Sequence, residues 1–137
     1  MSKPAESDAV VTSLGWTLQI DRKDSLKIKQ QNGLFEVAET QLCQQLIKPG
    51  DRILDIGANI GYYTKLFAHL TGNSGSVHAF EPDIENLEIL RRNVTDELAH
   101  GTVTIHPVAL GSKTETANFY RHTDNGGKHR LYPSIVC

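Results

Sequence analysis

The fold is decided by residues 53–61, Ile-Leu-Asp-Ile-Gly-Ala-Asn-Ile-Gly, where a short apolar run leads directly into a glycine-rich turn. A second apolar run, at 76–80, ends on Glu81 and Pro82. In a βαβ unit this order places a glycine loop at the tip of one strand and an acid at the tip of the next, where a carboxylate can accept both hydroxyls of a ribose. The sequence therefore predicts a site for a ligand that contains a nucleoside.

The residues of the loop indicate which nucleoside it is. Dinucleotide sites favour Gly-x-Gly-x-x-Gly, whose middle glycine lets a backbone amide approach the pyrophosphate. Here the spacing is Gly57-x-Asn59-x-Gly61, and Asp55 lies at the end of the strand. A carboxylate at that point would repel a pyrophosphate, but it suits the ammonium and sulfonium groups of S-adenosylmethionine. A domain of an NAD(P)-dependent oxidoreductase is the alternative that this loop disfavours.

An ordered series of further motifs surrounds the loop: Phe35-Glu36, 49–51, 55–64, 79–82, Asn86, Leu90, Asn93 and 107–111. At this spacing, the stretch from about Phe35 to Tyr120 resembles the FkbM family of S-adenosylmethionine-dependent methyltransferases. The resemblance implies an α/β, Rossmann-like class I methyltransferase fold with a parallel sheet. It also implies S-adenosyl-L-methionine as cofactor and methyl transfer as the reaction, which we expect to be O-methyl transfer to a hydroxyl of a small molecule or sugar.

The predicted cofactor-binding residues are Asp55, Gly57, Ala58, Asn59, Gly61, Glu81 and Val108. Asp55 would provide the counter-charge for the ligand ammonium, and Glu81 would hold the ribose hydroxyls. Val108 falls where many relatives of the wider fold carry an acid near the adenine, and it offers only backbone or apolar contact. We can name no catalytic residue, because the groups that place the acceptor are expected downstream, and we predict no metal site.

Each of these residues also has a purely structural interpretation. The two glycines of the loop could serve only the turn and the packing of a helix, as in any βαβ unit. Asn59 could be a helix N-cap. Asp55 could accept hydrogen bonds only within its own loop, and Glu81 could be a solvated surface acid. We favour proximity to the ligand for all of them because of their neighbours in sequence.

The amino-terminal third predicts a hairpin and a helix. Apolar residues alternate at Trp16, Leu18 and Ile20 and again at 26–28, with a polar turn at 21–24 between them. A helix is expected over 36–47, with an apolar face of Ala38, Leu42 and Leu46, stopped by Pro49 and Gly50.

The core pattern alternates strands and helices, which predicts a parallel sheet. We expect strands at 52–56, 76–80 and 102–106, a loop at 71–75 and a short strand at 116–120. The first helix carries Tyr63, Leu66, Phe67 and Leu70 at helical spacing, and the second begins at the N-cap Asp83, continues through Val94 and buries Ile84, Leu87 and Leu90.

The chain therefore divides into three parts: a frayed tail at 1–13, the hairpin and helix at 14–48, and a partial S-adenosylmethionine-binding domain at 49–137. The fold looks incomplete at its carboxyl end, because no fourth core strand is readable after residue 111. The strand at 53–56 would then be a sheet edge, through which the chain could self-associate. A truncated enzyme is the expectation, and a non-catalytic nucleoside-binding remnant is a further alternative.

Composition limits the partners. The chain has 137 residues, a net charge of −2 and dispersed basic residues, so we expect no nucleic-acid partner and a small-molecule methyl acceptor. Its 2 cysteines lack metal or redox spacing. No run of apolar residues reaches membrane length, and the amino terminus has no signal-peptide core. These features predict a cytoplasmic protein.

Overall fold

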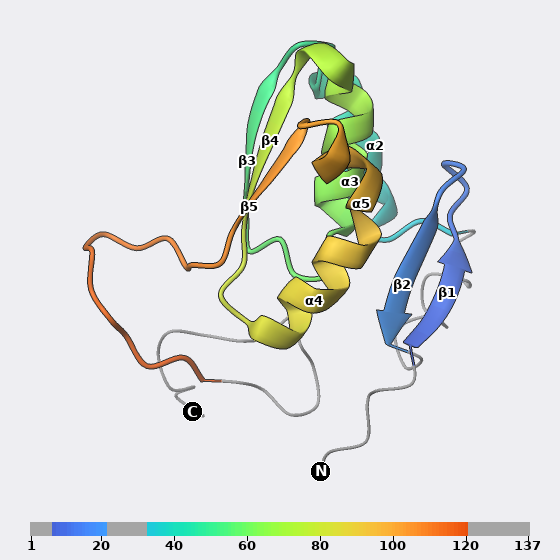
Figure 1. The fold of residues 1–137 in the computed structure, drawn as a ribbon. Coiled ribbons are helices and arrows are strands. Elements are labelled where there is room, and N and C mark those ends of the chain that lie inside the picture. The colour runs from blue at the N-terminus through green and yellow to red at the C-terminus, as the bar shows by residue number, and fades with distance from the viewer. Residues whose placement is uncertain (1–6, 22–32, 121–137) are drawn as a thin grey trace.

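The computed structural model describes residues 7–21 and 33–120. Its centre is a parallel sheet of β3 (Arg52–Ile56), β4 (Ser76–Phe80) and β5 (Val103–His106), in the order β3-β4-β5. Figure 1 shows one face of this sheet covered by helices, with a separate two-stranded hairpin beyond them. The three predicted core strands and their parallel order are confirmed.

The covering layer consists of α2 (Val37–Leu46), α3 (Tyr62–Thr71), α4 (Ile84–Asn93) and α5 (Thr95–Ala99). A 3-10 turn at Gly72–Ser74 lies in the expected loop between α3 and β4. The predicted helices match α2, α3 and α4, whereas α5 was not predicted. It follows α4 almost without interruption, and at five residues it is too short to carry a periodic signal.

Two hydrophobic clusters lie on either side of α3. One packs α4 and the sheet together around Leu90 and Val77, both fully buried. The other packs the hairpin against α3 around Leu18 and Leu66, which are also fully buried. Burying an aliphatic side chain of this size contributes about 1.5–3 kcal/mol, so both clusters stabilise the position of α3, which follows the glycine loop.

The hairpin differs from the prediction. Its strands are β1 (Ser7–Val11) and β2 (Thr17–Asp21), paired antiparallel from Ser7 opposite Asp21 to Val11 opposite Thr17. The alternating residues after Trp16 were predicted correctly as a strand, β2. The strand that pairs with β2 precedes it in the chain, so the expected fraying of residues 7–11 is wrong. The buried Val10 and Thr12 alternate as a strand requires, and the turn uses Gly15 at φ 90°. The expected strand at 26–28 lies outside the described residues.

Two predicted apolar faces are also wrong in part. In α2, all three residues of the predicted face, Ala38, Leu42 and Leu46, are exposed, and the helix contacts α3 through the buried Thr40 instead. In α4, Leu87 and Leu90 are buried as expected, but Ile84 is 69% exposed because it lies in the first turn, beyond the edge of the core. The predicted strand at 116–120 is reduced to an isolated bridge at its last residue.

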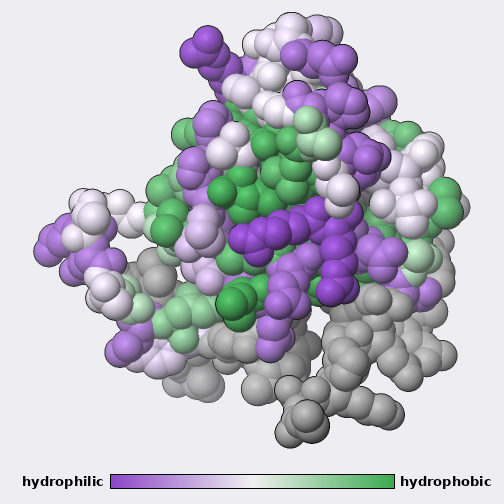
Figure 2. Space-filling model, viewed as in Figure 1, coloured by the Kyte–Doolittle hydropathy of each residue, from purple (hydrophilic) through white to green (hydrophobic). Residues whose placement is uncertain are grey.

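The second face of the sheet carries exposed apolar side chains. Leu54 and Ile56 of β3 are 60% and 63% exposed, and among the described residues β3 pairs only with β4. The rings of His78 and His106 hydrogen-bond to each other on the neighbouring strands, at 3.0 Å. Figure 2, viewed as in Figure 1, shows hydrophobic residues gathered in the middle of the molecule, over the region of the strands and helices, with hydrophilic residues around them. The face therefore resembles half of an interface rather than a solvated sheet surface.

Candidate functional site

The glycine loop that follows β3 is held against the end of β4. The amides of Gly57 and Ala58 both donate to the carbonyl of Phe80, at 2.9 and 3.0 Å. The amide of Asn59 donates to Oε2 of Glu81 at 2.8 Å. Three residues of the loop have positive φ: Gly57 at 83°, Asn59 at 51° and Gly61 at 91°. The loop therefore has an uncommon left-handed backbone that depends on its neighbours for support.

Glu81 is the residue that fixes this loop to the next one. Its side chain is only 5% exposed, so the interpretation as a solvated surface acid is wrong. Oε2 accepts from Asn59, and Oε1 accepts from the amide of Asp83 at 2.8 Å. Each carboxylate oxygen has two lone pairs, so both oxygens keep a free acceptor position after binding these amides. The carboxylate can therefore position two loops and still accept hydroxyl groups of a ligand.

Asp55, at the end of β3, is the second buried carboxylate. It is 8% exposed, and its Oδ2 accepts a hydrogen bond from the hydroxyl of Thr64 at 2.5 Å. Burial raises the pKa of Asp55; the hydrogen bond from Thr64 lowers it, and the charge of Glu81 raises it further. The two carboxylates thus lie close enough to repel each other, and a cation placed beside them would be attracted to both.

The two glycines of the loop have different surroundings. A Cβ on Gly57 would meet nothing within 4 Å, so this residue borders open space. A Cβ on Gly61 would collide with the side chain of Leu90 in α4. Helix packing is therefore sufficient to explain Gly61, whereas Gly57 leaves a surface that a ligand can approach. Direct binding by either glycine stays a prediction.

The other predicted residues occupy distinct positions. Ala58 is 5% exposed, and its side chain belongs to the hydrophobic cluster of the sheet. Within the loop, only its backbone is available to a ligand. Asn59 is not the N-cap of α3, because Gly61 occupies that position without a side-chain hydrogen bond. Val108 follows β5 with its side chain 49% exposed and its amide bonded to the carbonyl of His106. Its contact with a ligand stays a prediction.

Two polar residues that support the site, Thr64 and Asn93, were not predicted from the sequence. Thr64 was part of the matched motif, but its position in the first turn of α3 was not used to pair it with Asp55. Asn93 was noted only as a motif residue, and its side chain binds both the hairpin and the glycine loop. Spacing along the chain could have suggested the first contact. The second joins residues 74 positions apart and has no local signal.

Two general features bear on the kind of site. Within residues 7–21 and 33–120, no three His, Cys, Asp or Glu side chains are grouped so that they could hold a metal ion. In the same residues, no helix has the length and apolarity needed to cross a membrane.

Known proteins resemble this chain in sequence and in fold. The 31-O-demethyl-FK506 methyltransferase FkbM of Streptomyces tacrolimicus is 38% identical over 74 residues, which are 54% of this chain and 28% of the relative. The chain thus spans well under half of that protein.

Two solved structures share the fold at low identity. They are TYW2 of Pyrococcus horikoshii in complex with MeSAdo, 20% identical with a TM-score of 0.56, and the transferase PH0793 of the same organism, 19% identical with a TM-score of 0.57. The matches cover 79% of this chain and 38% of the first structure, and 77% of this chain and 37% of the second. With the parallel sheet, they support the Rossmann-like class I methyltransferase fold.

A family model, described as the methyltransferase FkbM domain, matches residues 55–137. The match begins at the buried carboxylate of β3, includes the glycine loop, Glu81 and α4, and covers more than half of the chain. The chain therefore belongs to the FkbM methyltransferase domain family.

Proposed function

We propose that this chain binds S-adenosyl-L-methionine at the carboxyl ends of β3 and β4 and serves a methyltransferase. One observation carries the proposal: a glycine loop with positive φ is held by a buried Glu81, directly beside a second buried carboxylate, Asp55. Two like charges kept together in a buried position are costly, and a cationic ligand would compensate them.

The donor set fits the cofactor. Glu81 retains acceptor capacity for the ribose hydroxyls, and Asp55 would face the ammonium group. The open space above Gly57 would admit the methionine portion of the ligand over the backbone of the loop. When bound, the cofactor supplies an activated methyl group on a sulfonium. The residues described here orient the cofactor and exclude water from it, and none of them is assigned as the base.

We further propose that the acceptor is a hydroxyl of a small molecule or sugar, so that the reaction is an O-methyl transfer. The support is the similarity to a relative whose name specifies an O-demethyl substrate. A cytoplasmic location belongs to the same proposal. Its support is the free thiol of Cys43, which is compatible with a reducing compartment.

Isothermal titration calorimetry tests the binding proposal. The chain should bind S-adenosylhomocysteine and should not bind NADH. Glu81→Gln should weaken the binding by about 1–3 kcal/mol, because a carboxylate that accepts hydroxyls is replaced by a neutral amide. Glu88→Ala is the matched control, since Glu88 is exposed on α4, and it should bind as the wild type does.

The other outcomes separate the alternatives. Binding of NADH instead of S-adenosylhomocysteine would indicate an oxidoreductase domain. Binding of neither ligand by a folded chain, as judged by circular dichroism, would contradict the proposal. An unchanged affinity in Glu81→Gln would remove Glu81 from the ribose site.

A further inference from the structure

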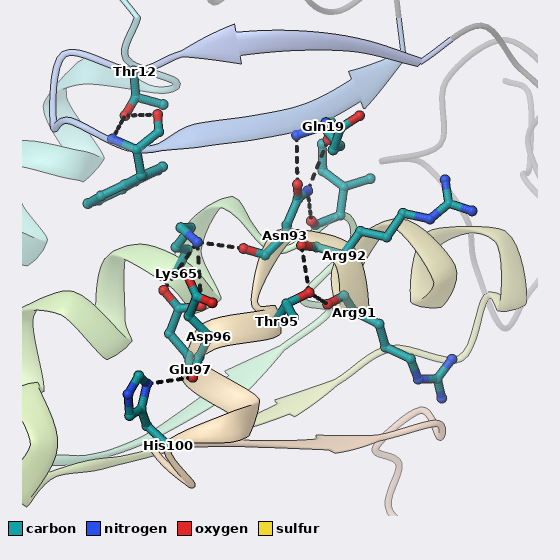
Figure 3. A network of polar contacts seen from close by, with 12 residues as sticks. Thr12, Gln19, Lys65, Arg91, Arg92, Asn93, Thr95, Asp96, Glu97 and His100 are labelled. Atoms are coloured by element: carbon teal, nitrogen blue, oxygen red, sulfur yellow. Dashed lines mark hydrogen bonds and ion pairs between the residues drawn. The ribbon is translucent and has the colours of Figure 1, made fainter.

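Asn93, the last residue of α4, connects three parts of the molecule: its buried side chain binds two of them, and its backbone carbonyl binds the third. It is 3% exposed and lies between the hairpin and the glycine loop. Figure 3 shows the network of polar contacts around it. A buried amide carries two donor hydrogens and an acceptor oxygen, so its partners define a fixed orientation of the side chain.

The first part is the hairpin. Oδ1 of Asn93 accepts from the amide of Gln19 at 2.6 Å, and Nδ2 donates to the carbonyl of the same residue at 2.9 Å. β2 pairs with β1 along one of its edges. On the opposite edge of β2, the side-chain amide of Asn93 binds the N–H and the carbonyl of Gln19. The side chain therefore does for Gln19 what a neighbouring strand would do, and it fixes the hairpin to the end of α4.

The second part is the glycine loop. Nδ2 of Asn93 also donates to the carbonyl of Ile60 at 2.6 Å. The loop is otherwise held from the side of β4, by Phe80 and Glu81. The contact with Asn93 holds it from the opposite side, between Asn59 and Gly61, which have positive φ.

The third part is α3, which holds the end of α4 in place. Nζ of Lys65 donates to the backbone carbonyl of Asn93 at 2.7 Å and forms an ion pair with Glu97 at 3.2 Å. A cation at the last carbonyls of a helix interacts favourably with the helix dipole. The backbone of Asn93 is therefore held independently of the hairpin and the loop, so a displacement of the hairpin acts on the loop through the side-chain amide of Asn93.

We propose that Asn93 is a positioning residue for the cofactor, which holds the loop in its binding conformation and couples that conformation to the docking of the hairpin. The inference rests on the proposed function. Its physical reason is that the carbonyl of Ile60 and the peptide of Gln19 share one donor atom, Nδ2. Displacing the hairpin displaces the amide, and the loop then loses its support on the side facing away from β4.

The test compares two substitutions at this position. Asn93→Leu has a similar volume and removes all three hydrogen bonds. Asn93→Asp retains an acceptor for the amide of Gln19 but places an acidic oxygen against two carbonyl groups. Thr71→Val is the matched control, because it removes the buried hydroxyl of a fully buried residue at the far end of α3.

Three quantities are measured on the 137-residue chain, at a temperature where circular dichroism shows every variant to be folded. They are the melting temperature, the dissociation constant for S-adenosylhomocysteine, and the hydrogen-exchange rate of the Gly61 amide, which donates to the carbonyl of Ala58. Both Asn93 variants should bind about tenfold more weakly or worse, within the usual range of coupling between sites. They should also exchange the Gly61 amide faster, whereas Thr71→Val should lower only the melting temperature.

A purely structural role would change the melting temperature in all three variants and leave affinity and Gly61 exchange as in the wild type, and that result would overturn the proposal. If the wild type does not bind S-adenosylhomocysteine, the proposed function fails by itself. Hydrogen exchange then still tests whether Asn93 couples the loop to the hairpin. Faster exchange of the Gly61 amide in Asn93→Leu supports this coupling, and unchanged exchange refutes it.

Discussion

Asp55 shows how burial and charge compete at the scale of one residue. Its pKa is raised chiefly by burial, so folding disfavours its charged form. We predict that Asp55→Asn retains the fold, since the amide oxygen can still accept from Thr64. The variant should bind S-adenosylhomocysteine more weakly by about 1.5–3 kcal/mol, the range for hydrogen bonds to charged groups. Calorimetry on the two proteins measures this difference.

The raised pKa also fixes the sign of a pH effect. The stability that Asp55 contributes to the unliganded fold is fully present below its ordinary pKa and is lost as pH rises through the raised value. Urea unfolding at a series of pH values should therefore show the wild type losing stability relative to Asp55→Asn as the pH rises through this range. A difference that does not depend on pH would show that Asp55 has no raised pKa.

The loop glycines permit a paired prediction. Gly57→Ala introduces a side chain into open space at positive φ, which costs about 1–2 kcal/mol of strain and obstructs the surface where the ligand is expected. Gly61→Ala carries the same strain and also collides with Leu90. Thermal unfolding should therefore rank Gly61→Ala as the less stable variant. Gly57→Ala should lose affinity for S-adenosylhomocysteine while remaining folded, and normal binding by this variant would contradict a ligand above the loop.

Some residue-level assignments were predictable because they depend on local rules. Asp83 was expected to cap α4, and its side chain accepts from the amides of Glu85 and Asn86. Asn59 has the residue type of a cap but does not act as one, since the N-cap position lies two residues later, at Gly61. Whether a glycine is required for packing or for a ligand depends on the residue that lies opposite it in space, as Leu90 lies opposite Gly61. The residues adjacent in sequence do not indicate this contact.

At the scale of the element, strands and helices were predicted correctly where apolar residues recur at regular spacing. Errors concerned the partner of a strand and the face of a helix that is buried. The alternation at Trp16, Leu18 and Ile20 defines a strand but not the neighbour with which it pairs. β1 was overlooked because its sequence, Ser-Asp-Ala-Val-Val, begins with polar residues. In α2, the apolar Leu42 and Leu46 indicated the wrong face, because the helix contacts α3 through the hydroxyl of Thr40, next to the ring of Phe35 just before the helix.

Those hydroxyl groups provide a test of how α2 is held. The buried hydroxyl of Tyr62 accepts from the amide of Phe35 at 3.2 Å and lies 3.0 Å from the hydroxyl of Thr40. We predict that Tyr62→Phe destabilises the protein by about 1–2 kcal/mol, because the part-buried amide of Phe35 and the buried hydroxyl of Thr40 both lose their contact with the Tyr62 hydroxyl.

Tyr63→Phe is the adjacent control. The hydroxyl of Tyr63 donates to Glu36 at 2.8 Å in a solvent-accessible position, so its loss should change stability by less than about 0.5 kcal/mol. Chemical denaturation measures both values. Equal effects of the two substitutions would show that α2 is not held through the hydroxyl of Tyr62.

At the scale of the whole molecule, the order of strands was predictable because parallel βαβ units have few topologies. The arrangement of the hairpin beyond the helices was not, because it depends on contacts such as that of Asn93, which are remote in sequence. Among the described residues, no helix or strand covers the second face of the sheet, where Leu54 and Ile56 are exposed.

The exposed face and edge of β3 lead to a prediction about association. The 137-residue chain should self-associate with increasing concentration, because Leu54 is 60% exposed and one edge of β3 is unpaired among the described residues. Light scattering should show less association for Leu54→Lys, since a charged side chain on an edge strand opposes pairing. Ile84→Lys changes an apolar residue on α4 that is even more exposed, at 69%, and should associate as the wild type does. A wild-type chain that stays monomeric would contradict the prediction.

The thiol of Cys43 is half-buried in α2, and its position near Asp55 has a practical consequence. Burial is the main cause that raises its pKa, and the negative charge of Asp55 raises it further, so the thiolate fraction of Cys43 depends in part on the charge at the end of β3. Alkylating reagents react with the thiolate. In a Cys137→Ser background, the rate of labelling at Cys43 should rise when a cation neutralises Asp55. Occupancy of the site could then be followed as a reaction rate, without modifying any residue that holds the ligand.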